Sequence, residues 1–360
     1  MSAPLSVSVV VPVRNAAHTL GKVLAALRAS ELPRASYEVI VVDDSSSDGS
    51  AAIAARHADT VIRLNGRVCG PAYARNRGAE LARAEVVFFL DPDVVVPSDA
   101  LPRMLATLAT HRSLDAVSAS QGESAGAPNF ASQYWNLLLR FGEQRHARPF
   151  GSFTGGCVAV RRTAFLSAGM YDEWRFGTAS LESLEFGQRL HGTGHNTLRD
   201  PALEVTRLTQ WTVASICREV WQRSVLLARS LGFQRTRVDE PSEVVFTLSR
   251  TLTPALAVVA TLTLAGAFLP HPYIASETGI ALGAVLLSNF SIHRFYANAR
   301  GIGFAIAAAP LHLCVQIVSA IALCTGWALR DAVGDVLPDA TTQAYSEVGL
   351  QVWPPVPRRL

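Results

Sequence analysis

The first 120 residues alternate between short apolar runs rich in β-branched residues and longer segments with helical periodicity. Runs such as 6–13, 38–44 and 86–91 have the length of buried strands, and the segments between them are long enough for a helix. Repeated units of strand, helix and strand fold into a parallel sheet with helices on both faces. We therefore predict an α/β fold with a Rossmann-like, mostly parallel sheet.

Polar side chains stand at the ends of three of these predicted strands. They are Arg14 and Asn15 after the first, Asp43 and Asp44 after the second, and Asp91 and Asp93 after the fourth. The carboxyl ends of parallel strands meet at one edge of the sheet, where such folds bind ligands. Each residue alone is equally well explained as a helix cap or a turn former. All three pairs together indicate a ligand site.

Asp91 and Asp93 are separated only by Pro92. Side chains at positions i and i+2 of an extended segment point to the same side, so the two carboxylates can converge on one point. Their hard oxygen atoms suit a divalent cation such as Mg²⁺ or Mn²⁺. The alternative is an Asp-Pro turn in which one carboxylate caps the backbone.

The last third of the chain is strongly apolar. The apolar fraction of 49% and the mean hydropathy of +0.23 exceed what a soluble domain of this length usually carries. The surplus lies in the stretches 251–269, 273–292 and 302–329. A membrane-spanning helix needs ~20 apolar residues, so the first and third qualify, whereas the second contains Glu277 and suits a span or an interfacial segment. We predict about three membrane helices.

Arginines flank these stretches unevenly. Arg235, Arg237 and Arg250 precede the first stretch, Arg294 and Arg300 lie between the second and third, and the loop 270–273 has no Lys or Arg. Because basic loops stay on the cytoplasmic side, we predict a multi-pass protein of the cell membrane with its first 250 residues in the cytoplasm. The predicted boundaries are 1–232 for the N-terminal domain, 233–250 for a juxtamembrane linker, 251–329 for the membrane helices and 330–360 for the tail.

Six segments occur in an order and at a spacing that resemble the family 2 glycosyltransferases with a GT-A fold. They are "VVPVRNAAHTL", "EVIVVDDSSSDGS", "ARNRGAELARAE", "VVFFLDPDVVVP", "FTGGCVAVRRTAFLSAGMYDE" and "LESLEFGQRL". The resemblance covers about residues 6–230, and the apolar stretches look like those of bacterial members that end in membrane helices. It implies an enzyme that transfers a sugar from a nucleoside diphosphate donor with inversion.

The resemblance also assigns roles to individual residues. Asp93 would bind Mg²⁺ or Mn²⁺ directly, and Asp91 would contact the sugar or ribose and steady the ion. The other members of the implied nucleotide-sugar site are Pro12, Val13 and Arg14 along the base, Asp44 with Asp43 behind it as acceptor from the base, Arg75 and Asn76 of the "ARN" element, and Gly155 and Gly156 beside the sugar or acceptor. Arg75 and Asn76 also suit a solvated helix face, and the two glycines also suit close packing at a strand.

The chain departs from the family pattern where the catalytic base is expected. Members that glycosylate hydroxyls carry a Glu-Asp pair there, and this chain has Glu182 followed by Ser183. Glu185 lies three positions further on and can face the same cleft at helical spacing. Many relatives also have a His after the following strand as a metal ligand, where "EVTRL" offers only Thr206. The candidate catalytic residues are therefore Asp91, Asp93, Glu182 and Glu185.

The missing base bears on the acceptor. A hydroxyl must lose its proton as it attacks, whereas a polyprenyl phosphate is already ionised. We therefore predict a membrane enzyme with a nucleoside diphosphate sugar as donor and a lipid or lipid-linked acceptor. The alternatives are a pseudoenzyme or subunit that binds nucleotide-sugars without turnover, and a polysaccharide-building enzyme with a hydroxyl acceptor. The net charge of +3 is too small to indicate nucleic acid as a partner.

Overall fold

A computed structural model of the chain describes residues 5–65, 68–145, 156–173, 182–230, 283–285, 287–329 and 349–353. The chain forms two compact units. The first is drawn from 1–128, 142–210 and 336–360, and the second from 129–141 and 211–335. The N-terminal domain predicted for 1–232 is thus divided, because 129–141 and 211–230 belong to the helical second unit.

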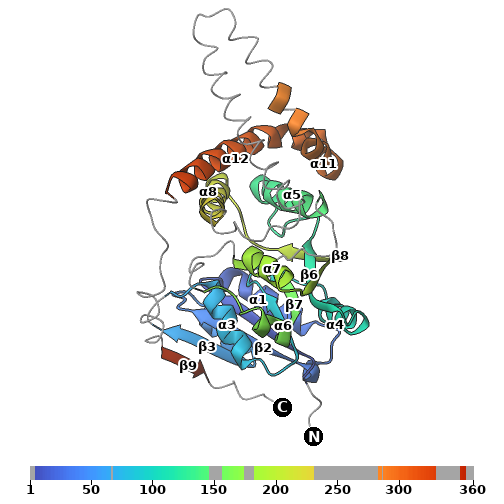
Figure 1. Cartoon of the computed structure of the whole chain (residues 1–360), viewed down its shortest axis with the longest axis vertical. Helices are drawn as coiled ribbons and strands as arrows, with labels where there is room; N and C mark the ends of the chain where they lie inside the picture. Colours follow the sequence, from blue (N-terminus) through green and yellow to red (C-terminus); the bar gives the residue numbers. More distant parts are fainter. Residues whose placement is uncertain are drawn as a thin grey trace, which may run out of the picture. The chain divides into compact units, whose positions relative to one another are not determined.

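The first unit contains a sheet whose strands follow the order β5-β8-β6-β7-β4-β1-β2-β3-β9 (Figure 1). The strands are β1 Val7–Val13, β2 Tyr37–Asp44, β3 Thr60–Asn65, β4 Val86–Leu90, β5 Val94–Val95, β6 Leu114–Gln121, β7 Cys157–Arg161, β8 Asn196–Arg207 and β9 Gly349–Trp353. Strands β4, β1, β2 and β3 are parallel to one another, as are β6 and β8, whereas β5, β7 and β9 are antiparallel to their neighbours. The predicted α/β fold is confirmed, with a mixed sheet.

Helices cover both faces of this sheet. They are α1 Ala17–Arg28, α2 Ser50–His57, α3 Pro71–Leu81, α4 Ala100–Thr110, α6 Arg162–Ser167 and α7 Glu182–Gly192. Successive residues of β1 alternate between two apolar clusters, because successive strand side chains point to opposite faces. Val9 and Val11 pack in the cluster that contains α1 and α4, and Val10 packs in the one that contains α3, α6 and α7. Strands that are buried on both faces read as continuous apolar runs in the sequence.

Helix α3 approaches the sheet closely at Gly78. A Cβ atom built on Gly78 would lie 2.3 Å from Val10 Cγ1 and 3.2 Å from Val42 Cγ2. Only glycine leaves room for this approach. The helix that carries Arg75 and Asn76 is therefore held tightly against β1 and β2.

We expect Gly78→Ala to destabilise the first unit. Overpacking a closed core costs about 1–3 kcal/mol, which outweighs the gain of up to about 1 kcal/mol from the better helix propensity of alanine. Urea unfolding would measure the change. Gly21→Ala in α1 is the matched control, since its Cβ would meet only Ile53 Cγ2 at 3.9 Å. An unchanged unfolding midpoint in Gly78→Ala would show that α3 moves away freely.

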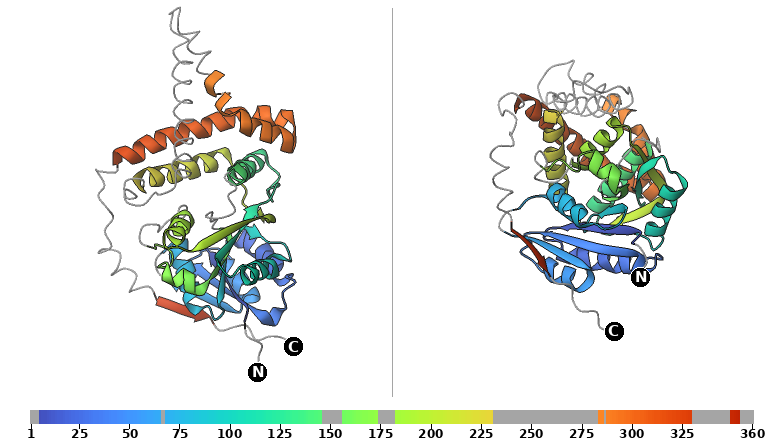
Figure 2. Two further views of the ribbon diagram at one scale, coloured as in Figure 1. Left: turned by 45° about the vertical axis from the view of Figure 1, so that its right-hand side comes forward. Right: turned by 60° about the horizontal axis from the view of Figure 1, so that its bottom comes forward.

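The second unit is helical. Its helices are residues 130–141 of α5 Phe130–Arg145, together with α8 Val213–Ser230, α11 Phe290–Arg300 and α12 Ile302–Leu329. Their shared core includes Leu137, Ile216, Ile292, Ala308 and Val315. α8 and α12 lie side by side (Figure 2). The Sγ atoms of Cys217 and Cys314 are 3.9 Å apart, and the hydroxyls of Ser224 and Ser319 are 3.1 Å apart.

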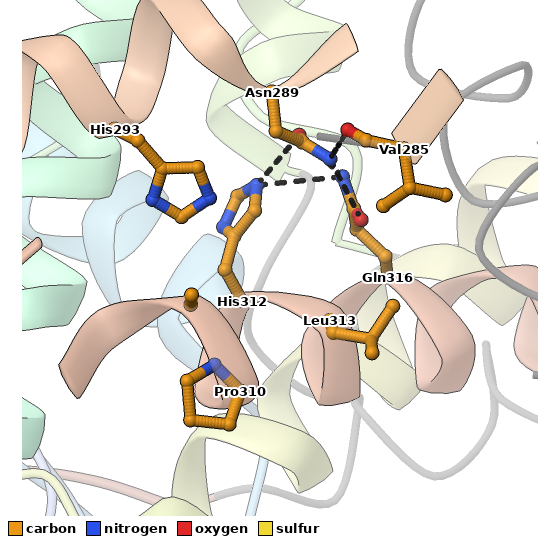
Figure 3. A pocket seen from close by; sticks show the side chains of 8 residues that line it. Val285, Asn289, His293, Pro310, His312, Leu313 and Gln316 are labelled. Carbon is orange, nitrogen blue, oxygen red and sulfur yellow. Dashed lines mark hydrogen bonds between the residues drawn. The ribbon is translucent and has the colours of Figure 1, made fainter. Parts of the chain in front are cut away.

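A buried polar network lies within this apolar core (Figure 3). Asn289 Oδ1 accepts a hydrogen bond from Gln316 Nε2 at 2.8 Å and lies 3.1 Å from His312 Nε2. The opposite ring nitrogen of His312 lies 3.0 Å from the hydroxyl of Tyr134. Because Asn289 Oδ1 can only accept, His312 Nε2 carries the proton and Nδ1 accepts from Tyr134. The network therefore ties α5, α11 and α12 together.

Of the helices in the described ranges, α12 alone is long and apolar enough to cross a membrane. It has 28 residues, and its most apolar window has a hydropathy of 2.0 and is 39% buried inside the protein. The predicted stretch 251–269 lies outside the described residues. The end of the stretch 273–292 belongs to α11, which continues into the polar sequence around Arg294 and Arg300. The described residues therefore support one such helix and do not support the multi-pass prediction.

Candidate active site

The loops after β1 and β2 are joined at the carboxyl edge of the sheet. Pro12 and Val13 are buried in β1, and Arg14 is exposed directly after the strand. Asn15 adopts a left-handed conformation with φ 49°, and its Oδ1 accepts from the backbone N–H of Ser47 at 2.9 Å. The predicted convergence of the first two strand ends is therefore present.

Asp44 and Asp43 have different surroundings. Both oxygens of Asp44 accept from backbone N–H groups that lead into α3, from Cys69 at 2.8 Å and from Gly70 at 2.8 Å. Oδ1 of Asp43 accepts from the N–H of Ser46 at 3.1 Å. Its buried Oδ2 has no hydrogen bond within the described residues and lies 3.5 Å from the Arg63 guanidinium. Asp44 thus fixes the loop before α3, and the fully buried Asp43 is paired with Arg63.

Asp91 and Asp93 converge as predicted, and the group between them is the guanidinium of Arg207. Nη1 of Arg207 lies 2.9 and 3.0 Å from the two oxygens of Asp93, and Nη2 lies 3.3 Å from Asp91 Oδ2. The Thr209 hydroxyl also donates to Asp93 Oδ2. Burial lowers the pKa of Arg207, but the charges of Asp93 and Asp91 outweigh that effect and raise it, so the guanidinium stays protonated.

Arg75 holds the other side of Asp91. Its Nη2 donates to Asp91 Oδ1 at 2.7 Å, and its Nη1 donates to Glu182 Oε1 at 2.9 Å. The guanidinium also lies over the ring of Tyr171, 5.3 Å from the centroid. Burial raises the pKa of Asp91, yet Arg75 and Arg207 outweigh it and hold that pKa below its ordinary value. Arg75 is only 4% exposed, so it is the centre of a buried charge network rather than a free phosphate ligand.

The donor set around Asp91 and Asp93 does not fit a divalent cation. Each of the four carboxylate oxygens already accepts from a guanidinium or a hydroxyl. Within the described ranges, no group of three or more His, Cys, Asp or Glu side chains is placed to hold a metal. One or two carboxylates together with substrate phosphates are enough to hold Mg²⁺, but here both carboxylates are already engaged by the guanidinium groups of Arg75 and Arg207.

Arg207 was missed by the sequence interpretation, which considered only Thr206 in this strand. Pairing of β5 with β8 places Arg207 opposite Val94, immediately after the Asp91–Asp93 segment. Gly156 provides the space, since a Cβ there would lie 2.5 Å from Arg207 Nη2 and 3.3 Å from Asp91 Oδ2. Gly155 lies outside the described residues. An arginine at a strand end was the only sequence signal, and the strand pairing that gives it meaning is long-range.

Asn76 is turned toward a neighbouring segment of the chain. Its Nδ2 donates to the carbonyl oxygen of Tyr171 and to Glu173 Oε2, each at 2.9 Å, and its Oδ1 accepts from the N–H of Tyr171 at 3.0 Å. These three bonds fix the segment 171–173 against α3. The predicted contact between Asn76 and the nucleotide-sugar stays a prediction.

The two glutamates near the expected base position are both engaged. Glu182 is buried and paired with Arg75. Glu185 pairs with Arg189 at 2.7 Å, and Arg189 in turn donates to the carbonyl oxygens of Ala168 and Met170. Ser183 stands between them in sequence, where the family pattern has an aspartate. Neither carboxylate is therefore a free base.

A family model described as glycosyl transferase family 2 matches residues 8–168 of the chain. The glycosyltransferase Rv0539 of Mycobacterium tuberculosis, itself named as uncharacterized, is 30% identical over 177 residues, which cover 46% of this chain and 72% of that relative. This chain belongs to glycosyl transferase family 2. The family model covers the first four of the six motifs and part of the fifth, and it ends before the sixth at 181–190.

Two further glycosyltransferases match over shorter segments. Glycosyltransferase AglE of Haloferax volcanii is 34% identical over 106 residues, which cover 28% of this chain and 35% of AglE. The poly(ribitol-phosphate) beta-glucosyltransferase of Bacillus spizizenii is 32% identical over 104 residues, which cover 28% of this chain and 16% of that relative. The chain thus matches about a third or less of the length of these two relatives.

The predicted GT-A fold is confirmed by a solved member of this fold class. The structure of mannosyltransferase PcManGT from Pyrobaculum calidifontis, in complex with GDP-Man and Mn²⁺, has a TM-score of 0.57 and 18% sequence identity to this chain. The alignment covers 89% of this chain and 87% of that one. At this identity the likeness concerns the fold.

Proposed function

We propose that this family 2 glycosyltransferase moves a sugar, with inversion, from a nucleoside diphosphate donor to a lipid-associated acceptor with an ionised headgroup, such as polyprenyl phosphate. The proposed donor site consists of the residues that the sequence indicated. These are Pro12, Val13, Arg14, Asp43, Asp44, Arg75, Asn76, Asp91, Asp93, Gly155 and Gly156. PcManGT was solved with GDP-Man and Mn²⁺, which supports a nucleotide-sugar as donor, whereas the Mg²⁺ or Mn²⁺ predicted from the sequence is not supported by the contacts of Asp91 and Asp93.

The observation that carries this proposal is the engagement of both glutamates. Glu182 is bound by Arg75, Glu185 is bound by Arg189, and residue 183 is a serine. A positioned general base contributes about 10²–10⁴-fold to the attack of a hydroxyl. A phosphate acceptor is ionised near neutral pH and does not need this contribution. The arrangement therefore favours an acceptor that arrives deprotonated.

We expect Glu185→Gln to retain transfer activity within about tenfold of the wild type, because no proton needs to be removed. Transfer from radiolabelled donors into polyprenyl phosphate, compared with transfer into hydroxyl acceptors, would measure it. Glu182→Gln is expected to retain a good part of the activity as well, since a carboxamide oxygen still accepts from Arg75. A thousandfold loss in either variant, while it remains folded at the assay temperature, would identify that carboxylate as the base and a hydroxyl as the acceptor.

The second unit supports a membrane location for the acceptor. The large apolar side chains exposed on α12 are Ile302, Ile306, Ile321, Trp327 and Leu329. α12 also runs alongside α8, which exposes Arg218 and carries the ion pair of Glu219 with Arg223. A charge at the centre of a bilayer costs about 2.5–3.5 kcal/mol. We therefore propose that α12 lies in the membrane surface, with the first unit on the cytoplasmic side.

One further reading is supported by the same contacts. A site in which Asp91, Asp93, Glu182 and Glu185 are all held by arginines also suits a subunit that binds a nucleotide-sugar without turnover. Donor hydrolysis and transfer by the purified chain separate the two. Binding of a nucleoside diphosphate sugar without either reaction, across a panel of phosphate-headed and hydroxyl acceptors, would favour the binding subunit.

A further inference from the structure

The carboxylates of Asp91 and Asp93 both contact the guanidinium of Arg207. We propose that Arg207 takes the place of the divalent cation in this chain: its guanidinium binds the diphosphate of the donor, and donor binding and sugar transfer proceed without a metal. The inference rests on the proposed nucleoside diphosphate donor. It differs from the metal site predicted from the sequence, because the fold delivers a fixed positive charge to the same two carboxylates.

The guanidinium keeps donors available for a ligand. Arg207 uses Nη1 for Asp93 and one N–H of Nη2 for Asp91. A guanidinium has five N–H groups, so Nε–H and the second N–H of Nη2 are left for phosphate oxygens. The Arg207 side chain is 26% exposed, whereas Arg75 is 4% exposed and is held by two carboxylates. Arg207 is therefore the arginine of the pair that an incoming diphosphate can reach.

A metal at this point would have to displace Arg207. A cation bound at about 2.1 Å from a carboxylate oxygen of Asp93 would lie within about 5 Å of the Arg207 nitrogen, which is 2.9 Å from that oxygen. Two cations at that separation repel each other strongly when they are partly buried. Moving Arg207 away would break its contacts with both aspartates. The carboxylates thus position an arginine here rather than a metal ion.

The surroundings of Arg207 are shaped to hold it. The register of β8 with β5 places it opposite Val94, and the N–H of Leu208 donates to the carbonyl oxygen of Asp93 at 2.7 Å. Gly156 leaves room for the guanidinium, because a Cβ atom at this position would lie only 2.5 Å from Arg207 Nη2. Thr209 donates to the same carboxylate that holds Nη1. Backbone pairing, a glycine and a hydroxyl therefore fix one position for this side chain.

The chemistry requires only charge stabilisation at this point. An oxygen of the ionised acceptor attacks the anomeric carbon, and the bond from that carbon to the β-phosphate oxygen breaks. The electron pair leaves with the nucleoside diphosphate, whose β-phosphate gains negative charge. N–H groups of Arg207 that point at this phosphate stabilise the leaving group, as a fixed donor does without reorganisation.

The test is nucleotide binding by the purified full chain, measured by calorimetry with UDP and GDP, in EDTA and in Mn²⁺. We expect wild-type affinity for the preferred nucleotide to differ by less than about threefold between the two conditions. Arg207→Met should weaken binding by about 10- to 100-fold, as expected for the loss of hydrogen bonds to a charged group. Arg207→Lys should bind the nucleotide with an affinity between those of the wild type and Arg207→Met, because lysine keeps the positive charge and loses the paired N–H groups of the guanidinium.

Arg207→His provides the converse variant. A histidine beside Asp91 and Asp93 completes a set of metal ligands, so Mn²⁺ should strengthen nucleotide binding by this variant and not by the wild type. Arg103→Met is the matched control, since Arg103 pairs with Asp200 and lies outside the site.

Wild-type binding that is abolished in EDTA and restored by Mn²⁺ would overturn the inference while leaving the proposed function in place. Wild-type affinity in a folded Arg207→Met variant would have the same consequence. Absence of nucleotide binding in every condition would overturn the proposed function as well.

Discussion

Asp93→Ala is expected to reduce sugar transfer by about 10²–10³-fold, the range seen when one preorganised electrostatic group is removed from an active site. Asp93 accepts two of the three hydrogen bonds that hold Arg207, both from Nη1. The hydroxyl of Thr209 also donates to Asp93. Without the carboxylate, the guanidinium loses its fixed position and no longer meets the diphosphate. Transfer from a radiolabelled donor, measured at saturating donor, would show the loss in kcat.

The fold should tolerate this change. The Asp93 side chain is 19% exposed, and Arg207 keeps Asp91 as a partner, so we expect thermal unfolding within a few degrees of the wild type. Asp99→Ala is the matched control, since Asp99 is 45% exposed and makes only a 4.0 Å contact with Arg103. Full transfer activity in Asp93→Ala would exclude Asp93 from the reaction under either a metal or an arginine mechanism.

Arg75→Met is expected to lower both stability and activity, with the largest effect on folding of all the changes considered. Its loss removes a guanidinium from both Asp91 and Glu182, which are 19% and 7% exposed. Removing one partner of a buried ion pair costs about 3–5 kcal/mol. Urea unfolding would measure the change in free energy, and nucleotide binding would show whether Asp91 keeps its position.

A second substitution distinguishes a charge effect from a packing effect. Glu182→Gln in the Arg75→Met background removes the carboxylate that has lost Arg75 as its partner, whereas Asp91 keeps Arg207, so it should recover part of the lost stability. The same Glu182→Gln change in the wild-type background should destabilise, because it weakens an intact pair. Equal effects of Glu182→Gln in both backgrounds would mean that Arg75 contributes through packing on Tyr171 rather than through its charge.

Local sequence patterns predicted the elements of the first unit well. The apolar runs 6–13, 38–44 and 86–91 became β1, β2 and β4, and the spacing of Asp91 and Asp93 correctly predicted that their carboxylates converge. These features depend on side-chain periodicity over a few neighbouring residues, which the sequence displays directly. The six motifs also indicated the family, since each is short and their order is fixed by the chain.

The tertiary structure decided how the site is charged and how the chain is divided. Arg207 meets Asp91 and Asp93 only because β8 pairs with β5, and Glu182 meets Arg75 across 107 residues of sequence. Likewise, residues 129–141 and 211–230 join the helical unit rather than the sheet, because their apolar faces pack against α11 and α12. An ion pair or a helix face finds its partner through strand register and packing between distant segments. The sequence by itself determined which side chains reach the carboxyl edge, and the long-range pairing determined that an arginine stands between the two aspartates.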